Sequence, residues 1–367
     1  MRPALPACLA VLILLGGEAS ARPHSLGIAV PPGESTIAYD MNAAGQVAAV
    51  LEDGDGHTRG VLFEKGKITD LGARGGMHSD ARGINDRGEI IGSVRNKDGT
   101  WKAFLFHRSS GMRVMGTLGG PSSYGMGINQ EGVSVGFADI PNGDWHAFIN
   151  DGGEQLRDLG TLGGNISYAS GINKHRQVAG TAANADGYRH AFLYTSERGM
   201  VDLGTLGGRQ SSAMAINDNG VVVGASETRD RRWRAFVHDG KRMVDLGALI
   251  GNYNSFATDI NNAGRVVGTV LVGQERMSFV WRDKKMTVHR GGQGLHLTNA
   301  INDRELVIGA TYDHGMTAAT MASNAAAVIT RGGSELLTLI AGVLAMAGLA
   351  VLYRWRSRGI EIASAGG

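Results

Sequence analysis

The chain has 367 residues, 57 of them glycine, and its 36 lysine and arginine residues nearly balance 34 aspartate and glutamate residues. A nucleic-acid-binding protein normally carries a basic stripe, so the net charge of +2 without such a stripe excludes nucleic acid as an expected partner. The glycines recur at fixed intervals, which indicates turns in a regular fold and not a low-complexity segment.

The N-terminal segment, residues 1–21, is typical of a secretory signal peptide. One arginine precedes an apolar run, and small residues follow it up to Ala21. We expect cleavage after Ala21. Because this removes Cys8, the only cysteine, the exported chain has no disulfide and depends on its own core for stability.

Residues 22–333 consist of a repeated unit. Its marker is an asparagine, usually preceded by isoleucine and followed by a short turn and a valine-rich strand that ends in glycine. Seven asparagines carry the marker, at steps of 43, 44, 44, 44, 44 and 41 residues: Asn42, Asn85, Asn129, Asn173, Asn217, Asn261 and Asn302. We interpret them as structural residues of the repeated turns.

Each unit contains four short strand signals. The first enters the marker, the second follows its turn, the third carries Ala-Phe, and the fourth leads into Asp-Leu-Gly. Turns such as 217–220, with Asn first and Gly fourth, suit a type I turn that closes with a glycine bulge. The strands are apolar on both faces, as expected for sheets covered by neighbours on both sides.

A unit of about 44 residues with four strands has the size of a propeller blade. The fold class that we predict is all-β: a seven-bladed β-propeller of four-stranded repeats. An open solenoid of stacked coils is the structural alternative. Two segments compete for the strand that closes the ring, residues 23–27 and residues 327–330, and the Leu-Gly in the N-terminal segment favours the first.

The third-strand motif resembles that of the HAF repeat proteins, which are bacterial extracellular repeat proteins. The matching motifs are His146-Ala147-Phe148, His190-Ala191-Phe192, Asp-Leu-Gly-Thr-Leu-Gly-Gly at Asp158 and Asp202, and Gly-Ile-Asn at Asn85, Asn129 and Asn173. Lys102 and Arg234 replace the histidine in two repeats, and Val114 replaces the aspartate in one. The resemblance implies an exported or surface protein of unassigned activity and supplies no catalytic residues.

The C-terminal part predicts a membrane anchor. Residues 334–353 form a transmembrane helix in this interpretation, since the run from Leu336 to Tyr353 contains no charged residue. The arginines that follow place the basic tail, residues 354–367, in the cytoplasm. An apolar helix followed by arginines also resembles a C-terminal sorting signal, for which the partner is a sorting protease that removes it. The expected partners are thus the membrane and, in the alternative, that protease.

The sequence assigns no catalytic residue, no metal ligand and no cofactor. It contains no nucleophile elbow, zinc-protease motif or phosphate loop. The second position of the asparagine turns does not keep a carboxylate, so these turns are not expected to bind calcium. The four Asp-Leu-Gly aspartates are expected to bond backbone amides in turns: Asp70, Asp158, Asp202 and Asp245. His146 and His190 lie one repeat apart, which leaves a shared metal open as an alternative to a tolerated polar position.

Aromatic residues just before the third strands are the candidate binding residues: Trp101, Trp145, Tyr188 and Trp233. On one rim they would form an aromatic binding surface for a sugar ring or a peptide. Packing between hairpins is the alternative.

We therefore expect an exported, membrane-anchored repeat protein that acts as a binding module at the cell envelope, with a glycan or protein as ligand. The alternatives are an envelope polysaccharide-processing enzyme, a lyase or hydrolase, and a purely structural surface component.

Overall fold

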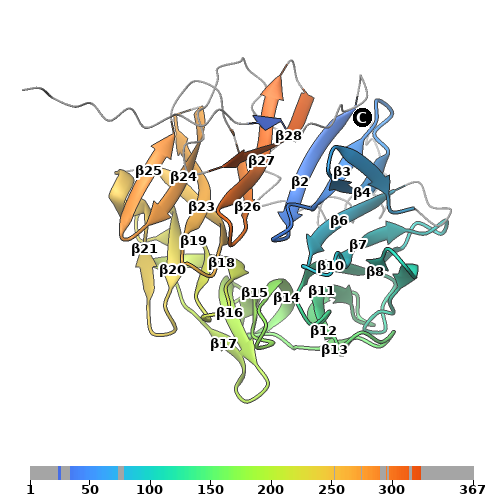
Figure 1. Cartoon of the computed structure of the whole chain (residues 1–367). Coiled ribbons are helices and arrows are strands. Elements are labelled where there is room, and N and C mark those ends of the chain that lie inside the picture. Colours follow the sequence, from blue (N-terminus) through green and yellow to red (C-terminus); the bar gives the residue numbers. More distant parts are fainter. Residues whose placement is uncertain are drawn as a thin grey trace, which may run out of the picture.

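The computed structural model describes residues 24–25, 34–72, 78–251, 253–273, 275–289, 295, 297–313 and 316–323. These residues form seven four-stranded antiparallel sheets, which follow one another around a ring in chain order (Figure 1). The expectation of an all-β propeller fold is confirmed. The described residues contain one short 3-10 helix, η1 (Gly247–Ile250).

We number the sheets as blades along the chain. Blade 1 contains β2 (Ser35–Met41), β3 (Val47–Glu52), β4 (Thr58–Glu64) and β5 (Lys67–Asp70). Blade 2 contains β6 (Ser79–Ile84), β7 (Ile90–Arg95), β8 (Trp101–His107) and β9 (Gly111–Val114). Blade 3 contains β10 (Ser123–Ile128), β11 (Ser134–Asp139), β12 (Trp145–Asn150) and β13 (Arg157–Asp158). Blade 4 contains β14 (Gly163–Ile172), β15 (Val178–Asn184), β16 (Arg189–Thr195) and β17 (Gly199–Asp202).

Blades 5 and 6 continue the pattern. Blade 5 contains β18 (Gly207–Ile216), β19 (Val222–Thr228), β20 (Trp233–His238) and β21 (Met243–Asp245). Blade 6 contains β22 (Asn254–Ile260), β23 (Val266–Val272), β24 (Glu275–Arg282) and β25 (Lys285–His289). Blade 7 combines β26 (Leu297–Ile301), β27 (Leu306–Asp313) and β28 (Met316–Ser323) with the N-terminal strand β1 (His24–Ser25).

The N-terminal strand therefore completes the last blade, as the sequence favoured. In β1, His24 pairs with Met321 and Ser25 with Thr320 of β28. Innermost strand β2 of blade 1 also contacts β26 of blade 7, and the two lie side by side near the centre of Figure 1. The ring is closed by strands from both ends of the described chain.

The two faces of the ring follow from the antiparallel order of the strands. On one face, here the Asn-turn face, each innermost strand ends in a turn that begins with one of the seven marker asparagines. On the other, the connector face, second strands turn into third strands and outermost strands lead to the next blade. Side chains confirm the assignment at both ends of β4: Glu64 accepts a hydrogen bond from Gln46 of an asparagine turn at 2.8 Å, and the backbone of Thr58 donates to His78, which precedes β6, at 3.3 Å.

The marker asparagines hold the blades together. Each side-chain amide donates to the backbone carbonyl of the asparagine in the next blade, at 3.0–3.2 Å, and the last one returns to the first. All seven are buried. The side-chain oxygen also accepts backbone N–H groups of its own turn, as Asn217 does from Asn219 and Val221. Each marker asparagine thus bonds both its own turn and the neighbouring blade.

The turns have the expected backbone. The fourth position has a positive φ in all seven, as in Gly220 at 76°, which glycine adopts without strain. Two blades have other residues there, Arg176 at 61° and Glu305 at 64°.

The Ala-Phe motif packs against the second strand. The third-strand phenylalanine lies directly opposite a second-strand glycine, as in Phe192 opposite Gly180. A Cβ atom on Gly180 would lie 2.2 Å from the carbonyl oxygen of Tyr168 and 2.7 Å from the Phe192 ring. Because Gly180 has no side chain, the Phe192 ring occupies the space that a side chain at position 180 would need. Phe192 is fully buried.

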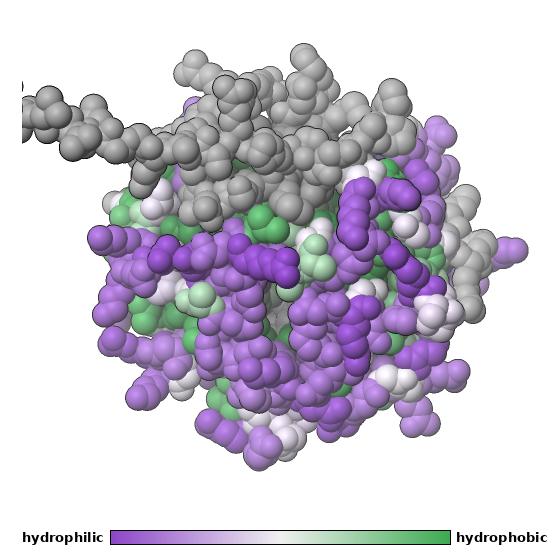
Figure 2. Space-filling view, viewed as in Figure 1, coloured by the Kyte–Doolittle hydropathy of each residue, from purple (hydrophilic) through white to green (hydrophobic). Residues whose placement is uncertain are grey.

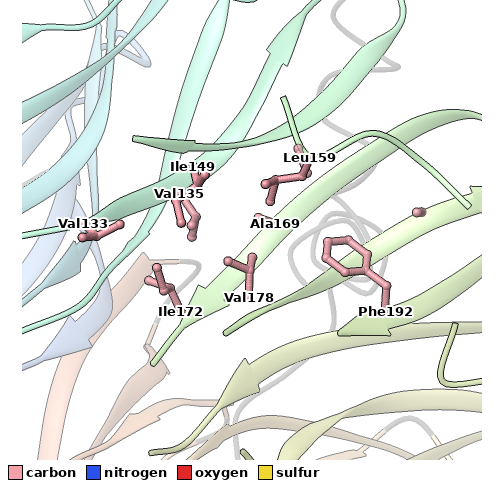
Figure 3. Packing of buried hydrophobic residues seen from close by; sticks show 10 residues of the cluster. Val133, Val135, Ile149, Leu159, Ala169, Ile172, Val178 and Phe192 are labelled. Atoms are coloured by element: carbon pink, nitrogen blue, oxygen red, sulfur yellow. The ribbon is translucent and has the colours of Figure 1, made fainter. Parts of the chain in front are cut away.

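The hydrophobic core lies between the blades. In Figure 3, Val133, Val135, Ile149 and Leu159 of blade 3 face Ala169, Ile172, Val178 and Phe192 of blade 4. Hydrophilic side chains cover most of the face seen in Figure 2, with smaller hydrophobic areas between them. Each sheet is therefore covered on both sides, as its lack of apolar alternation predicted.

Three predicted segments lie outside the described residues: the signal peptide 1–21, the transmembrane helix 334–353 and the tail 354–367. Within the described ranges, no helix has the length and hydrophobicity to span a membrane.

Candidate functional site

The predicted aromatic residues all lie at the connector face. Trp101, Trp145 and Trp233 are the first residues of β8, β12 and β20. Trp101 and Trp145 pair with the last residue of the second strand of their blade, and Trp233 pairs with the last but one. Tyr188 lies one residue outside this register, since β16 begins at Arg189. Arg189 thus takes, in blade 4, the place of the tryptophan in blades 2, 3 and 5.

Most of these aromatic rings pack between blades. Trp145 is buried and lies 5.8 Å from the Phe137 ring, so it belongs to the core. Trp233 stacks on Phe256 of blade 6 at 6.3 Å, and Arg209 of blade 5 lies 5.5 Å from the ring of Tyr188. Among the ring contacts of the described residues, none joins Tyr188 or Trp233 to Trp101 or Trp145.

An aromatic cluster that cannot be recognised from the repeat alone is centred on blade 3. Tyr124 of β10 stacks on Phe137 of β11, with ring centroids 4.7 Å apart. Trp101 of blade 2 lies 6.1 Å from Tyr124, and Tyr168 of blade 4 meets Phe137 edge-on at 6.3 Å. We call Trp101, Tyr124, Phe137, Trp145 and Tyr168 the aromatic cluster. In the sequence, its signal was Phe137, because the other second strands have a smaller residue at this position.

The cluster has a buried base and a partly exposed surface. Phe137 and Trp145 are buried, whereas Trp101, Tyr124 and Tyr168 are half-buried. Rings held from below by packed neighbours keep fixed orientations, which lowers the entropy lost on ligand binding.

Polar groups border the cluster at both ends. At one end, His78 lies 6.5 Å from Trp101, and burial, together with Arg95 and His57, lowers the pKa of His78, so its imidazole is neutral at pH 7. At the other end, the Tyr168 hydroxyl is hydrogen-bonded to Arg189, Thr181 and Ser212, and burial raises its pKa.

The histidines of the His-Ala-Phe motif pair with the aspartates of Asp-Leu-Gly in their own blade. His146 Nδ1 lies 2.7 Å from Asp158, and His190 Nδ1 lies 2.7 Å from Asp202. The same aspartates accept the backbone N–H of Gly160 and Gly204, which confirms their expected role in turns. Sequence reasoning missed the His–Asp pairing because the residues lie on different strands.

The remaining Asp-Leu-Gly aspartates behave alike. Asp70 accepts the backbone N–H of Gly72 at 2.8 Å, and Asp245 accepts that of Ala248 at 3.0 Å. Within the described part of the chain, one group of side chains has the spacing of metal ligands: Asp53, Asp55 and His57. Asp53 accepts hydrogen bonds from the backbone N–H groups of Asp55 and His57. Its position is therefore explained by its role in the β3–β4 turn.

Two half-buried carboxylates also break the repeat and were missed. Two residues before the marker asparagine, five blades have glycine or alanine, but blades 1 and 6 have Asp40 and Asp259. Each bridges to the next blade, Asp40 accepting the backbone N–H of Ile84 at 2.9 Å and Asp259 that of Ile301 at 2.7 Å. Burial raises the pKa of Asp40, and burial, together with the nearby Asp40 and Asp303, raises that of Asp259 to about 8. Repeat alignment on the asparagines reveals both residues.

No family model and no curated protein matches the chain. Solved structures share its fold. A Mycobacterium tuberculosis puromycin-hydrolyzing peptidase is 12% identical with a TM-score of 0.55, over 87% of this chain and 56% of that one. A Pyrococcus horikoshii acylaminoacyl peptidase is 14% identical with a TM-score of 0.50, over 84% and 54%.

TolB from Acinetobacter baumannii is 10% identical with a TM-score of 0.43, over 81% of this chain and 65% of that one. The chain thus spans 54–65% of the length of these three proteins. Identities this low show the fold alone and carry no activity to this chain.

Proposed function

We propose that the chain is an exported, membrane-anchored HAF repeat protein whose propeller is a binding module at the cell envelope. The observation that carries the proposal is the aromatic cluster, with Trp101, Tyr124 and Tyr168 half-buried above Phe137 and Trp145. Large rings fixed by packing and bordered by polar groups are typical of ligand-binding surfaces.

The topology supports an arrangement in which the face that carries the aromatic cluster points away from the predicted membrane anchor. The last residue of β28, Ser323, pairs with Leu306, which follows the Asn302 turn, so the chain leaves blade 7 at the Asn-turn face. β1 is antiparallel to β28, so it runs from the Asn-turn face towards the connector face. An anchor at residues 334–353 would therefore hold the Asn-turn face towards the membrane and leave the connector face, with its aromatic cluster, open.

Binding without turnover is the function we favour over the envelope polysaccharide-processing enzyme. Most glycoside hydrolases place a pair of carboxylates at the reacting bond, whereas the side chains that carry this proposal are aromatic rings. A purely structural component is the other alternative, favoured by the burial of Trp145 and by the inter-blade packing of Trp233.

The test is a glycan and peptide array probed with the full-length chain, with product analysis for each ligand that binds. We expect binding without turnover, and a loss of about tenfold or more in Trp101→Ala, because interface aromatics contribute about 2 kcal/mol or more. The control is Trp281→Ala, at the opposite end of a third strand in blade 6. Turnover supports the enzyme, and the absence of any ligand supports the structural role.

A further inference from the structure

The aromatic cluster continues into a cation that has no carboxylate partner. Arg189 is half-buried at the start of β16, where its guanidinium bonds the Tyr168 hydroxyl. One ion pair joins His190 to Asp202 within blade 4, and another joins Arg176 of blade 4 to Asp151 of blade 3. Within the described ranges, no ion pair includes Arg189.

An unpaired, partly desolvated guanidinium is costly, because it gives up hydration without gaining a counter-charge. The tryptophans at the equivalent positions show that a neutral side chain suits this register. A ligand that supplies an anion would compensate the cost, and the planar guanidinium binds a carboxylate through two parallel hydrogen bonds.

We propose that the aromatic cluster and Arg189 together bind a carboxylated sugar, such as a uronic acid residue of a polysaccharide. The proposal rests on the binding function proposed above and names its ligand class. The apolar face of the sugar ring stacks on Tyr124 or Trp101, and the carboxylate pairs with Arg189. The contacts from Trp101 through Tyr124, Phe137 and Tyr168 to Arg189 are continuous, so both interactions fall on one surface.

The polar groups around Tyr168 favour a sugar over an acidic peptide. Thr181 Oγ1 and Ser212 Oγ lie 2.7 Å apart, and both bond the Tyr168 hydroxyl. Thr181 is buried, whereas Tyr168 and Ser212 are half-buried. Beside Arg189, the ligand therefore meets the hydroxyl groups of Tyr168 and Ser212, which donate and accept and complement the hydroxyls of a sugar.

The experiment measures binding of the full-length chain to three probes: an oligogalacturonate, the same oligomer after its carboxyl groups are reduced to alcohols, and a poly-glutamate peptide. We expect the reduced oligomer and the peptide to bind at least about tenfold more weakly than the acidic oligomer. Arg189→Gln, which keeps an amide to bond Tyr168, should remove this difference between the oligomers. Arg189→Lys should restore part of it.

The matched control is Arg198→Gln, an exposed arginine in the β16–β17 turn of the same blade, which should leave all affinities unchanged. Equal binding of both oligomers that Trp101→Ala abolishes overturns the acidic ligand but keeps the binding function. Tighter binding of poly-glutamate that Arg189→Gln abolishes overturns the sugar. Binding of none of the probes overturns this ligand class, while the array described above decides the binding function separately.

Discussion

Asn302 donates a hydrogen bond from Nδ2 to the backbone carbonyl of Asn42 at 3.1 Å, although 260 residues separate them. This bond completes a circle in which each marker asparagine bonds the next blade. Because the same residue type makes the same bond at every blade junction, the junctions share one geometry, and the last blade meets the first without a special linker.

Asn302→Ala should lower the free energy of unfolding by about 2–4 kcal/mol. The substitution removes the bond to Asn42 and the two bonds that its side-chain oxygen accepts from Arg304 and Leu306, each worth about 1 kcal/mol. Denaturant unfolding measures the change. Asn219→Ala, on the exposed surface of another asparagine turn, should cost less than about 1 kcal/mol. An equal loss of unfolding free energy in both variants would show that the bonds of the marker asparagines stabilise the fold no more than an exposed turn residue does.

Deleting residues 22–30 should lower the melting temperature. The deletion removes β1, so β28 becomes the edge strand of blade 7 and keeps only its pairing with β27. We expect a loss of about 1–3 kcal/mol from the missing strand pairing, or several degrees. Scanning calorimetry of the mature chain checks this. An unchanged melting temperature would show that β1 does not hold the ring closed.

Gly220→Val should destabilise and Arg176→Gly should stabilise. Both residues occupy the fourth turn position, with φ of 76° and 61°, a conformation that costs about 1–2 kcal/mol with a side chain. A Cβ atom on Gly220 would also lie 3.1 Å from Gln177 Oε1. For Arg176→Gly we expect a net gain of up to about 1 kcal/mol, since its ion pairs with Glu131 and Asp151 are exposed and contribute little. The same sign for both changes contradicts the argument.

Asp259→Asn should make the stability of the chain less sensitive to high pH. The pKa of Asp259 is raised from 3.8 to about 8, so the folded state binds the proton more tightly than the unfolded state. Its favourable contribution is complete below about pH 4 and disappears as the pH rises through 8. Asparagine removes the charge, so the melting temperature at pH 9 should exceed that of the parent chain by a few degrees.

The control for that comparison is Asp186→Asn, an exposed residue of the β15–β16 turn, which should keep the parent's pH profile. If Asp259→Asn shifts the melting temperature equally at pH 5 and pH 9, the effect comes from lost hydrogen bonds and not from the charge.

A chelator should leave the melting curve unchanged. The asparagine turns are completed by bonds between side chains and backbone, as at Asn217, and need no ion. The turn of Asp53 and His57 is held in the same way. A fall of several degrees after dialysis against EDTA, reversed by calcium, would show that one of these turns binds metal.

Much of the fold was predictable because the same local sequence pattern occurs in successive repeats. The seven asparagines, the turn glycines and the Ala-Phe strands each mark a contact within one blade or at one junction. The site was less predictable. The sequence singled out Trp101 and Trp145, but their neighbours Tyr124, Phe137 and Tyr168 were not recognised.

One irregularity explains part of that difference. Each innermost strand shifts register just before its marker asparagine, as between Ala38 and Asp40 or between Ala257 and Asp259. A bulge leaves an extra residue unpaired and re-aims its neighbours. Side-chain alternation along the sequence therefore does not tell which residue beside the bulge reaches the next blade.

The sequence by itself determined the period, the strand order within a blade and the residues of the turns, because contacts close along the chain repeat with the chain. Only the tertiary structure decided which side chains meet between blades: Trp101 with Tyr124, Tyr168 with Phe137, and Asp259 with the backbone of Ile301. The physical reason is that most of these contacts join strands of different hairpins or different blades. Their geometry depends on the rotation from blade to blade and on the bulges, which no single repeat encodes.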